Sequence, residues 1–321
     1  MVLQRDRSTL TLEAPDTAAA AERGETRDPV GAVVVALAQV APRLGDVATN
    51  LERHLDVIEQ AVEQGARLVV FPELSLTGYF LKDLVPEVAL RPDAPELAAL
   101  AAASRRIDVL AGCVTETEST VFHNSALYFS AGRVLHTHHK VYLPTYGIFD
   151  ELRYLAAGAQ FRAFDVDLGP PGAATWRAGI LVCEDMWHPS AAALLARQGV
   201  DILFCPSASP GHGVSRDEAL GTARSYDAIT RTYAQLFTAY VAYCNRAGYE
   251  DGIWFWGGSR VVGPNGSVVD DAAATGESVS YHRIERAALR RARIAYPLLR
   301  DERHDVNDTE SDRIRRAAPR D

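Results

Sequence analysis

Short, fully apolar segments alternate with segments of helical periodicity over most of this chain, from about residue 31 to about residue 300. Apolar runs of four to eight residues between charged or turn-forming residues are typical of buried strands. Apolar residues spaced three or four apart are typical of helices that cover a sheet. The alternation of the two patterns favours one α/β domain with its helices outside the sheets. Two strand pairs are joined by short turns, so a purely parallel sheet is not expected.

The expected elements follow from these patterns. Strands are expected at residues 31–40, 67–73, 108–115, 124–130, 133–140, 177–183, 200–209 and 241–244. Helices are expected at about 51–65, from Pro95 onward, and at 189–199, 217–233 and 289–294. Ala131-Gly132 and Pro264-Asn265-Gly266 are typical of hairpin turns.

The two ends of the chain differ from this core. Residues 1–30 are polar and lack the apolar core of a signal peptide, so we interpret them as a disordered leader. Residues 301–321 form a charged tail. The core domain therefore spans 31–300, with no apolar run long enough to cross a membrane.

Charge and cysteine usage narrow the class of protein. A formal net charge of −9 argues against nucleic acid or an anionic membrane as the main partner. The four cysteines are scattered and form no CxxC pair, which favours free thiols in a reducing compartment. A cytoplasmic enzyme is consistent with both observations.

One of these cysteines, Cys183, lies between an apolar strand-like run and a helix start at Pro189. Three interpretations are open for it: a buried small hydrophobic residue, a metal ligand or a nucleophile. At such a corner, backbone N–H groups near a helix start are expected to lower the thiol pKa and favour the thiolate. Cys113, Cys205 and Cys244 lie inside apolar strands and are expected in the core.

Two further charged residues follow predicted strands. Glu73 ends one apolar run, and Lys140 follows an alternating strand just before a Pro-containing loop. A carboxylate at the end of a buried run needs a partner, although a solvated loop position is the simpler alternative. Most lysines are at the surface. Together with Cys183, however, these residues supply a proton acceptor, a positive charge and a nucleophile.

Three segments of the chain, VVFPELSLTGY, HHKVYLPTYGIFDELRY and GILVCEDMW, resemble the signature segments of the nitrilase superfamily of carbon–nitrogen hydrolases. The likeness is closest to the amidase and glutaminase branches, including the glutaminase domain of glutamine-dependent NAD synthetase. The resemblance covers about residues 31–300. It implies an α-β-β-α sandwich, usually assembled into homo-oligomers through the outer helices, and no cofactor.

The resemblance also implies roles for the matching residues. Glu73 matches the general base and acid, Lys140 the stabiliser of the tetrahedral intermediate and Cys183 the nucleophile. Glu151 matches a glutamate that orients the lysine and the substrate, although its polar segment is equally consistent with an exposed residue. The remaining matches are substrate-contacting positions: Tyr79, Tyr146 and either Ser207 or Ser209. In the mechanism that we expect, a backbone N–H near Glu184 stabilises the oxyanion together with Lys140.

Other motifs are set aside. His136, His138 and His139 lack the further ligands of a zinc site, so we interpret them as solvated and expect no metal. No phosphate-binding glycine motif or ATP pyrophosphatase loop is present, and the chain is too short for the synthetase domain of a full-length NAD synthetase.

The sequence thus predicts a cytoplasmic carbon–nitrogen hydrolase that cleaves a small-molecule amide through a cysteinyl thioester. Glu-Asp after Cys183, instead of Trp-Glu, favours amides over nitriles. The alternatives are a glutaminase subunit that supplies a separate synthetase partner, a nitrilase or carbamoylase, an acyl transferase and, least favoured, a non-catalytic oligomeric binding module.

Overall fold

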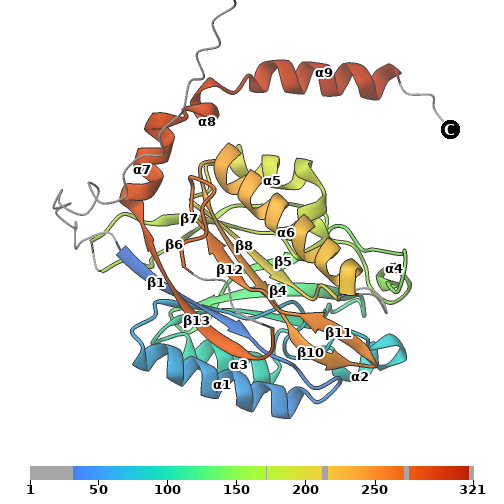
Figure 1. Ribbon diagram of the computed structural model, residues 1–321. Coiled ribbons are helices and arrows are strands. Elements are labelled where there is room, and N and C mark those ends of the chain that lie inside the picture. Colours follow the sequence, from blue (N-terminus) through green and yellow to red (C-terminus); the bar gives the residue numbers. More distant parts are fainter. Residues whose placement is uncertain (1–31, 171, 212–215, 271–274, 318–321) are drawn as a thin grey trace, which may run out of the picture.

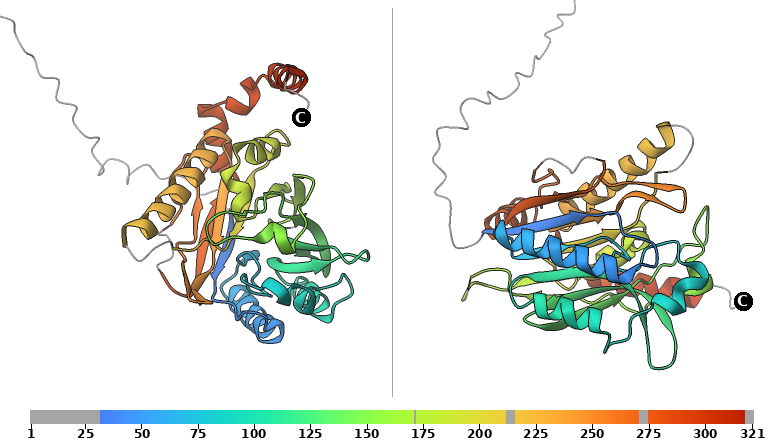
Figure 2. Two further views of the ribbon diagram at one scale, coloured as in Figure 1. Left: turned by 90° about the vertical axis from the view of Figure 1, so that its right-hand side faces the viewer. Right: turned by 90° about the horizontal axis from the view of Figure 1, so that it is seen from below.

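The computed structural model describes residues 32–170, 172–211, 216–270 and 275–317. Two mixed β-sheets pack face to face, and each outer face is covered by helices (Figures 1 and 2). The predicted four-layer α-β-β-α sandwich in a single domain is therefore confirmed. The leader predicted at residues 1–30 lies outside the described residues.

The first sheet has six strands in the order β13-β1-β2-β3-β4-β5. β1, β2 and β3 are parallel, whereas β13, β4 and β5 join by antiparallel pairing. The hairpin predicted at Ala131-Gly132 connects β4 to β5. The strands are β1 (Ala32–Gln39), β2 (Leu68–Val70), β3 (Asp108–Glu116), β4 (Phe122–Ser130), β5 (Arg133–His139) and β13 (Ser278–Glu285).

The second sheet has five strands in the order β12-β9-β8-β7-β6, with β7, β8 and β9 parallel. Its members are β6 (Phe164–Val166), β7 (Trp176–Ile180), β8 (Ile202–Ser207), β9 (Tyr240–Asn245) and β12 (Arg260–Val262). A separate hairpin pairs β10 (Ala247–Glu250) with β11 (Ile253–Trp256). The turn predicted around Pro264 follows β12, where Gly263 N–H donates to the Ser267 carbonyl at 2.8 Å.

Apolar side chains fill the space between the two sheets. Val35, Leu37 and Val70 of the first sheet pack in one cluster with Ile180 and Phe204 of the second. Alternate residues of β1 face the other way, since side chains on a strand point to opposite faces in turn. A fully buried side chain of this kind stabilises the fold by about 1.5–3 kcal/mol. The predicted strands are continuously apolar because both faces of each sheet are covered.

Helices α1 (Val47–Glu63) and α3 (Pro95–Ala103) cover the first sheet, and α5 (Pro189–Ala196) and α6 (Arg216–Leu236) cover the second (Figure 2). α1 begins where Asp46 accepts a hydrogen bond from the Thr49 N–H, and the helix buries Ile58 at the predicted spacing. The shorter helices are η1 (Lys82–Leu84), α2 (Val85–Val88), α4 (Glu151–Tyr154) and η2 (Cys183–Trp187).

The C-terminal part of the chain leaves the sandwich. α7 (Arg286–Ala295), α8 (Leu298–Asp301) and α9 (His304–Ala317) follow β13, and α9 lies away from the two sheets (Figure 1). Arg197 of α5 makes a two-point contact with Asp308 of α9, at 2.7 and 2.8 Å. Residues 304–317 of the predicted charged tail are therefore helical, and residues 318–321 lie outside the described part.

The strand directions bring distant residues to one edge. β5 is antiparallel to β4, which is antiparallel to β3, so β5 runs in the same direction as β2 and β3. The chain therefore leaves β2 and β5 at the same edge of the first sheet. β7 and β8 of the second sheet supply the segments that meet them there. This edge is where the predicted reactive residues are found.

Candidate active site

Glu73 lies three residues beyond the end of β2 and is only 1% exposed. Its Oε1 accepts hydrogen bonds from Asn124 Nδ2 and Lys140 Nζ, both at 2.7 Å, and its Oε2 accepts from the Ala208 N–H at 2.8 Å. Strand pairing stops early because Pro72 has no N–H to donate. A solvated loop position is therefore wrong for Glu73, since each carboxylate oxygen has a buried donor.

Two glycines allow this close packing. A Cβ on Gly112 of β3 would lie 2.4 Å from the Leu74 nitrogen, so only glycine lets the loop after Glu73 lie against the strand. A Cβ on Gly158 would lie 2.1 Å from the His139 carbonyl oxygen. The Gly158 N–H donates to the Lys140 carbonyl at 2.8 Å, and this bond holds the lysine backbone in place.

Lys140 follows β5 and is fully buried. Its ammonium donates to Glu73 Oε1 at 2.7 Å and to Glu151 Oε1 at 2.6 Å. Burial lowers the lysine pKa, but Glu151 and Glu73 outweigh it and raise the pKa well above the ordinary value. Lys140 therefore keeps its proton in the interior.

Glu151 is the first residue of α4 and is 7% exposed. Its Oε1 accepts hydrogen bonds from Lys140 Nζ and from the Tyr79 hydroxyl. Burial raises its pKa to about 7, although the neighbouring lysine lowers it. The structure thus joins Glu151 and Tyr79 to the Lys140 side of the site, and an exposed position for Glu151 is wrong.

Cys183 begins the short helix η2, three residues beyond the end of β7, and is 7% exposed. Its φ of 46° lies in the left-handed region, which a non-glycine residue occupies rarely and often at functional sites. The sulfur lies 3.4 Å from the Tyr226 hydroxyl. The Ala208 N–H that donates to Glu73 also lowers the pKa of Cys183, so it acts on both the carboxylate and the thiol.

The pKa of Cys183 differs from the sequence-based expectation. Burial and the Glu73 carboxylate raise it well above the ordinary thiol value, while Lys140, Tyr226 and the Ala208 N–H lower it by less. The predicted thiolate-favouring corner is therefore wrong for the resting protein. The physical reason is that the sulfur is removed from water and faces a carboxylate.

Asp185 connects the Lys140 and Cys183 segments and was not singled out from the sequence. Its Oδ1 accepts from the Val141 and Tyr142 N–H groups at 3.1 and 3.0 Å. Its Oδ2 accepts from the Val182 N–H at 3.0 Å and lies 2.8 Å from His138 Nε2. One fully buried carboxylate therefore binds the chain on both sides of the site.

The three histidines near Lys140 were predicted to be solvated, but His138 is buried and His136 and His139 are partly buried. His138 is 4% exposed and bonded to Asp185. His136 stacks on Phe164, and burial lowers the pKa of both His136 and His139 to about 4. Within the described ranges, no three His, Cys, Asp or Glu side chains are grouped so that they could hold a metal ion.

Tyr146 and Glu184 lie on the solvent side of the site. The Tyr146 hydroxyl donates to both carboxylate oxygens of Glu184, at 3.0 and 2.9 Å, and Tyr146 itself is 56% exposed. Burial raises the pKa of Glu184, and the Tyr146 hydrogen bond lowers it by less. The two predicted residues therefore lie next to Cys183. The charged group that they place there is the Glu184 carboxylate, which is negative.

Ser207 and Ser209, at the end of β8, form hydrogen bonds with different partners. Both are buried. The Ser207 hydroxyl donates to the Cys205 carbonyl at 3.4 Å, and the Ser209 hydroxyl accepts from Trp256 Nε1 at 3.3 Å. Between them, the Ala208 N–H is the group that reaches Glu73. The backbone of this segment therefore contributes directly to the site.

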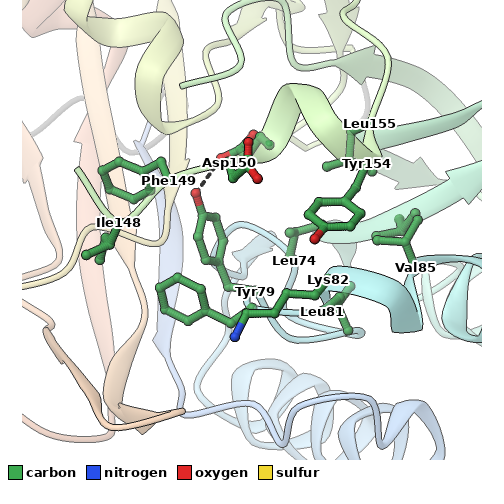
Figure 3. Close-up of a pocket in the computed structure, with 13 residues that line it drawn as sticks. Leu74, Tyr79, Leu81, Lys82, Val85, Ile148, Phe149, Asp150, Tyr154 and Leu155 are labelled. Atoms are coloured by element: carbon green, nitrogen blue, oxygen red, sulfur yellow. Dashed lines mark hydrogen bonds between the residues drawn. The ribbon is translucent and has the colours of Figure 1, made fainter. Parts of the chain in front are cut away.

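A cavity of about 120 Å³ adjoins the Lys140 side of the cluster (Figure 3). Tyr79 and Glu151 form part of its wall, and apolar side chains of Leu74, Val85 and Leu155 form much of the remainder. Figure 3 shows Tyr79 between Phe149 and Tyr154, with its hydroxyl directed at the start of α4. The cavity therefore lies next to the Glu151 carboxylate.

Three partners in the site were missed from the sequence: Asn124, Asp185 and Tyr226. Asn124 could have been found, because it is the first polar residue of the predicted strand 124–130, which pairs with the strand before Lys140. Asp185 and Tyr226 carry no comparable signal, since their partners come from segments distant in the sequence.

Comparisons with known proteins identify the family of this chain. The family model for carbon-nitrogen hydrolase matches residues 34–294. Glutamine-dependent NAD(+) synthetase of Thermotoga maritima is 34% identical over 244 residues, covering 74% of this chain and 39% of that protein. The structure of glutamine-dependent NAD+ synthetase from Acinetobacter baumannii has a TM-score of 0.70 at 30% identity and covers 80% of this chain and 46% of that one.

A second solved structure is matched over nearly its whole length, unlike the synthetase structure. Carbon-nitrogen hydrolase from Helicobacter pylori G27 has a TM-score of 0.77 at 25% identity, and the match covers 87% of this chain and 98% of that one. The chain therefore spans less than half the length of the synthetases above and nearly all of the Helicobacter hydrolase. No helix in the described part of the chain is long and apolar enough to cross a membrane.

Proposed function

This chain belongs to the carbon–nitrogen hydrolase family of the nitrilase superfamily, and we propose that it hydrolyses the terminal amide of a small substrate, glutamine first among the candidates, through a cysteinyl thioester. Hydrolysis of carbon–nitrogen bonds other than peptide bonds is the activity of the family. The observation that carries the finer proposal is the position of Lys140 between two buried carboxylates, with the Cys183 sulfur in the field of this cluster.

In the proposed acylation step, Glu73 accepts the Cys183 proton as the sulfur attacks the amide carbon. The carbonyl oxygen becomes an oxyanion, which is stabilised by Lys140 and the Glu184 backbone N–H. Two of the three ammonium protons of Lys140 are used by carboxylates, which leaves one for the oxyanion. Glu73 then transfers its proton to the departing nitrogen, and ammonia leaves.

In the proposed hydrolysis step, Glu73 accepts a proton from water while the water oxygen attacks the thioester carbon. The C–S bond breaks, and the electron pair returns to the sulfur, which regains the proton from Glu73. A raised Cys183 pKa is consistent with this scheme, because the proton leaves only as the bond to carbon forms.

Glu184 supports the choice of glutamine over simple amides. A half-buried carboxylate beside the nucleophile, oriented by the Tyr146 hydroxyl, suits a substrate that carries an ammonium group. Two of the relatives named above, the synthetases of Thermotoga maritima and Acinetobacter baumannii, are glutamine-dependent enzymes. We therefore place the substrate ammonium at Glu184 and Tyr146, and the amide at Cys183.

The test is ammonia release from glutamine, asparagine, aliphatic amides, nitriles and carbamoyl compounds. We expect glutamine to be the best substrate, with a thioester adduct on Cys183 detectable by mass spectrometry. Cys183→Ala should abolish turnover without unfolding the protein, whereas Cys113→Ala, at a core position, should retain it. Turnover by Cys183→Ala would rule out the covalent mechanism.

A second variant tests the substrate assignment alone. Glu184→Gln should raise KM for glutamine by about tenfold or more, the scale of one lost charge-assisted hydrogen bond. Its KM for an aliphatic amide should change little, because that substrate has no ammonium group. Equal effects on both substrates would contradict the placement of the ammonium at Glu184.

The synthetases that match this chain favour one further candidate role. They are glutamine-dependent NAD synthetases, which use glutamine as a nitrogen source for a synthetase reaction. We propose that a separate synthetase is the acceptor of the ammonia. Glutamine turnover that rises on addition of such a partner would support this role, and turnover indifferent to every candidate synthetase would argue for a free-standing amide hydrolase.

A further inference from the structure

Tyr226 brings a hydroxyl group to the sulfur of Cys183 from a distant element. It lies on α6, which covers the outer face of the second sheet, and it is 2% exposed. Its oxygen lies 3.4 Å from Cys183 Sγ and 3.1 Å from Trp187 Nε1. The Tyr226 ring packs between the rings of Trp187 and Tyr243, with centroid separations of 5.4 and 4.8 Å. This packing limits the movement of the Tyr226 ring.

The Trp187 contact favours the direction in which the Tyr226 hydroxyl donates to the sulfur. An indole N–H is only a donor, so the Tyr226 oxygen accepts from Trp187. The hydroxyl has one proton of its own, and the sulfur is the other partner at hydrogen-bonding distance. The proton of Tyr226 is therefore directed at Cys183. Burial and the nearby thiol raise the pKa of Tyr226 well above its ordinary value, so the hydroxyl keeps this proton.

We infer that Tyr226 is a further catalytic residue, which donates a hydrogen bond to the Cys183 sulfur whenever that sulfur carries negative charge. This inference rests on the proposed role of Cys183 as the nucleophile. Charge develops on the sulfur twice: when its proton passes to Glu73 during attack, and when the C–S bond of the thioester breaks. The Tyr226 proton stays on its own oxygen in both steps, so no additional reactant is required.

The surroundings of the sulfur explain why a donor is needed there. The thiol is buried beside the Glu73 carboxylate, which disfavours a second negative charge. Two N–H groups of Lys140 are already bonded to carboxylates, and in the proposed mechanism the third serves the oxyanion. A neutral hydroxyl stabilises the thiolate without disturbing the charges of this cluster.

Tyr226→Phe removes the donor and retains the ring. We expect iodoacetamide to alkylate Cys183 about tenfold more slowly near neutral pH, with the pH profile moved to higher pH by about one unit. We also expect kcat to fall about 10- to 100-fold with KM nearly unchanged, because the hydroxyl does not contact the substrate. The matched control is Tyr243→Phe, which removes another buried hydroxyl from the ring packed against Tyr226.

Fluorotyrosine at position 226 separates donation from packing. Fluorination makes the phenol a stronger donor at almost unchanged size, so the alkylation profile should move to lower pH, opposite to the effect of Tyr226→Phe. If Tyr226→Phe does not fold, the fluorotyrosine variant still tests whether the hydroxyl donates a hydrogen bond to the sulfur.

Two results would overturn the inference: wild-type alkylation and kcat in Tyr226→Phe, or an alkylation profile unchanged by fluorination. A failure of the proposed function would be seen separately, as turnover by Cys183→Ala. An inactive Cys183→Ala together with a wild-type Tyr226→Phe would reject the role of Tyr226 alone.

Discussion

Two carboxylates share one ammonium group in the interior of this protein. Lys140 lies 2.7 Å from Glu73 and 2.6 Å from Glu151, and all three side chains are buried. If all three were ionised, the cluster would carry a net negative charge in a region of low dielectric, which is unfavourable. Glu151 is the group whose pKa is raised by this arrangement.

The titration of Glu151 should be visible in the stability of the protein. Its pKa is raised from 4.5 to about 7 in the folded state, so the folded protein binds more protons than the unfolded chain between these values. Its contribution to the free energy of unfolding is therefore complete below about pH 4.5 and is lost as the pH rises through about 7.

We expect Glu151→Gln to remove the pH-dependent contribution of Glu151 to the free energy of unfolding. The difference in unfolding free energy between wild type and variant should change between pH 4.5 and 7 by up to roughly 3 kcal/mol. Urea unfolding at several pH values measures it. The comparison cancels His136 and His139, whose lowered pKa values of about 4 act in the opposite direction. A pH-independent difference would contradict the titration of Glu151.

Glu73 and Lys140 should affect Cys183 in opposite directions. Lys140→Met should raise the Cys183 pKa and slow alkylation, whereas Glu73→Gln should lower the pKa and speed it. Both variants should lose turnover, by ~10²–10³-fold for Lys140→Met and ~10²–10⁴-fold for Glu73→Gln. The measurement is the pH dependence of alkylation by iodoacetamide, with thermal unfolding as the control for folding. If Lys140→Met alkylates like wild type at every pH, the lysine does not act on the sulfur.

The site depends on hydrogen bonds between segments of different elements, and no single helix or strand forms it. Cys183 and Lys140 leave different sheets, and the Asp185 carboxylate holds their segments together through three backbone N–H groups and His138. Asp185 is fully buried, and both of its carboxylate oxygens are used by these donors. The distance between lysine and cysteine therefore depends on a residue that contacts neither side chain.

Asp185→Asn tests this connection. An asparagine has one carbonyl oxygen in place of two carboxylate oxygens, so at least one pair of donors is left without a partner. We expect a loss of about 2–5 kcal/mol in the free energy of unfolding and a larger fall in kcat than in KM. Urea unfolding and steady-state kinetics measure the two effects. Asp301→Asn, at an exposed position on α8, is the control that should change neither.

At the scale of the whole molecule, the outer helices leave apolar side chains uncovered. Leu194 on α5 is 46% exposed and Leu236 on α6 is 50% exposed, and Leu298 on α8 lines the same groove as Leu236. Exposed apolar groups gathered in one area are typical of protein interfaces. A second copy of the chain is the occupant that we propose, because the family resemblance of the sequence implies a homo-oligomer.

We therefore expect the protein to sediment as a dimer or larger homo-oligomer at micromolar concentration. The double variant Leu194→Lys/Leu236→Lys should weaken this association by about 100-fold or more, because each buried leucine stabilises an interface by about 1.5–3 kcal/mol. Val121→Lys, a partly exposed apolar position before β4, is the control that should assemble normally. A wild-type protein that stays monomeric would show that these helices are not an interface.

The amino-acid sequence by itself determined the class of protein and most of the central elements, whereas β6, β10, β11, β13 and α9 were not expected from it. The fully apolar runs predicted the central strands of both sheets, and the helical spacing of apolar residues from about residue 51 to 65 predicted α1. Burial of Cys113, Cys205 and Cys244 was also correctly predicted. These features depend on local periodicity and on the removal of apolar surface from water, which a sequence displays directly. The order of the three motifs was sufficient for the family.

The tertiary structure decided the electrostatics of the site and the partners of its residues. The protonation of Cys183 depends on burial and on Glu73, 110 positions earlier in the chain. The same holds for His138, whose partner Asp185 lies in η2 after β7, and for Tyr226, which α6 brings to the sulfur. A pKa or a hydrogen-bond partner depends on groups within a few ångströms in space, and no local pattern in the sequence records which distant segments will meet there.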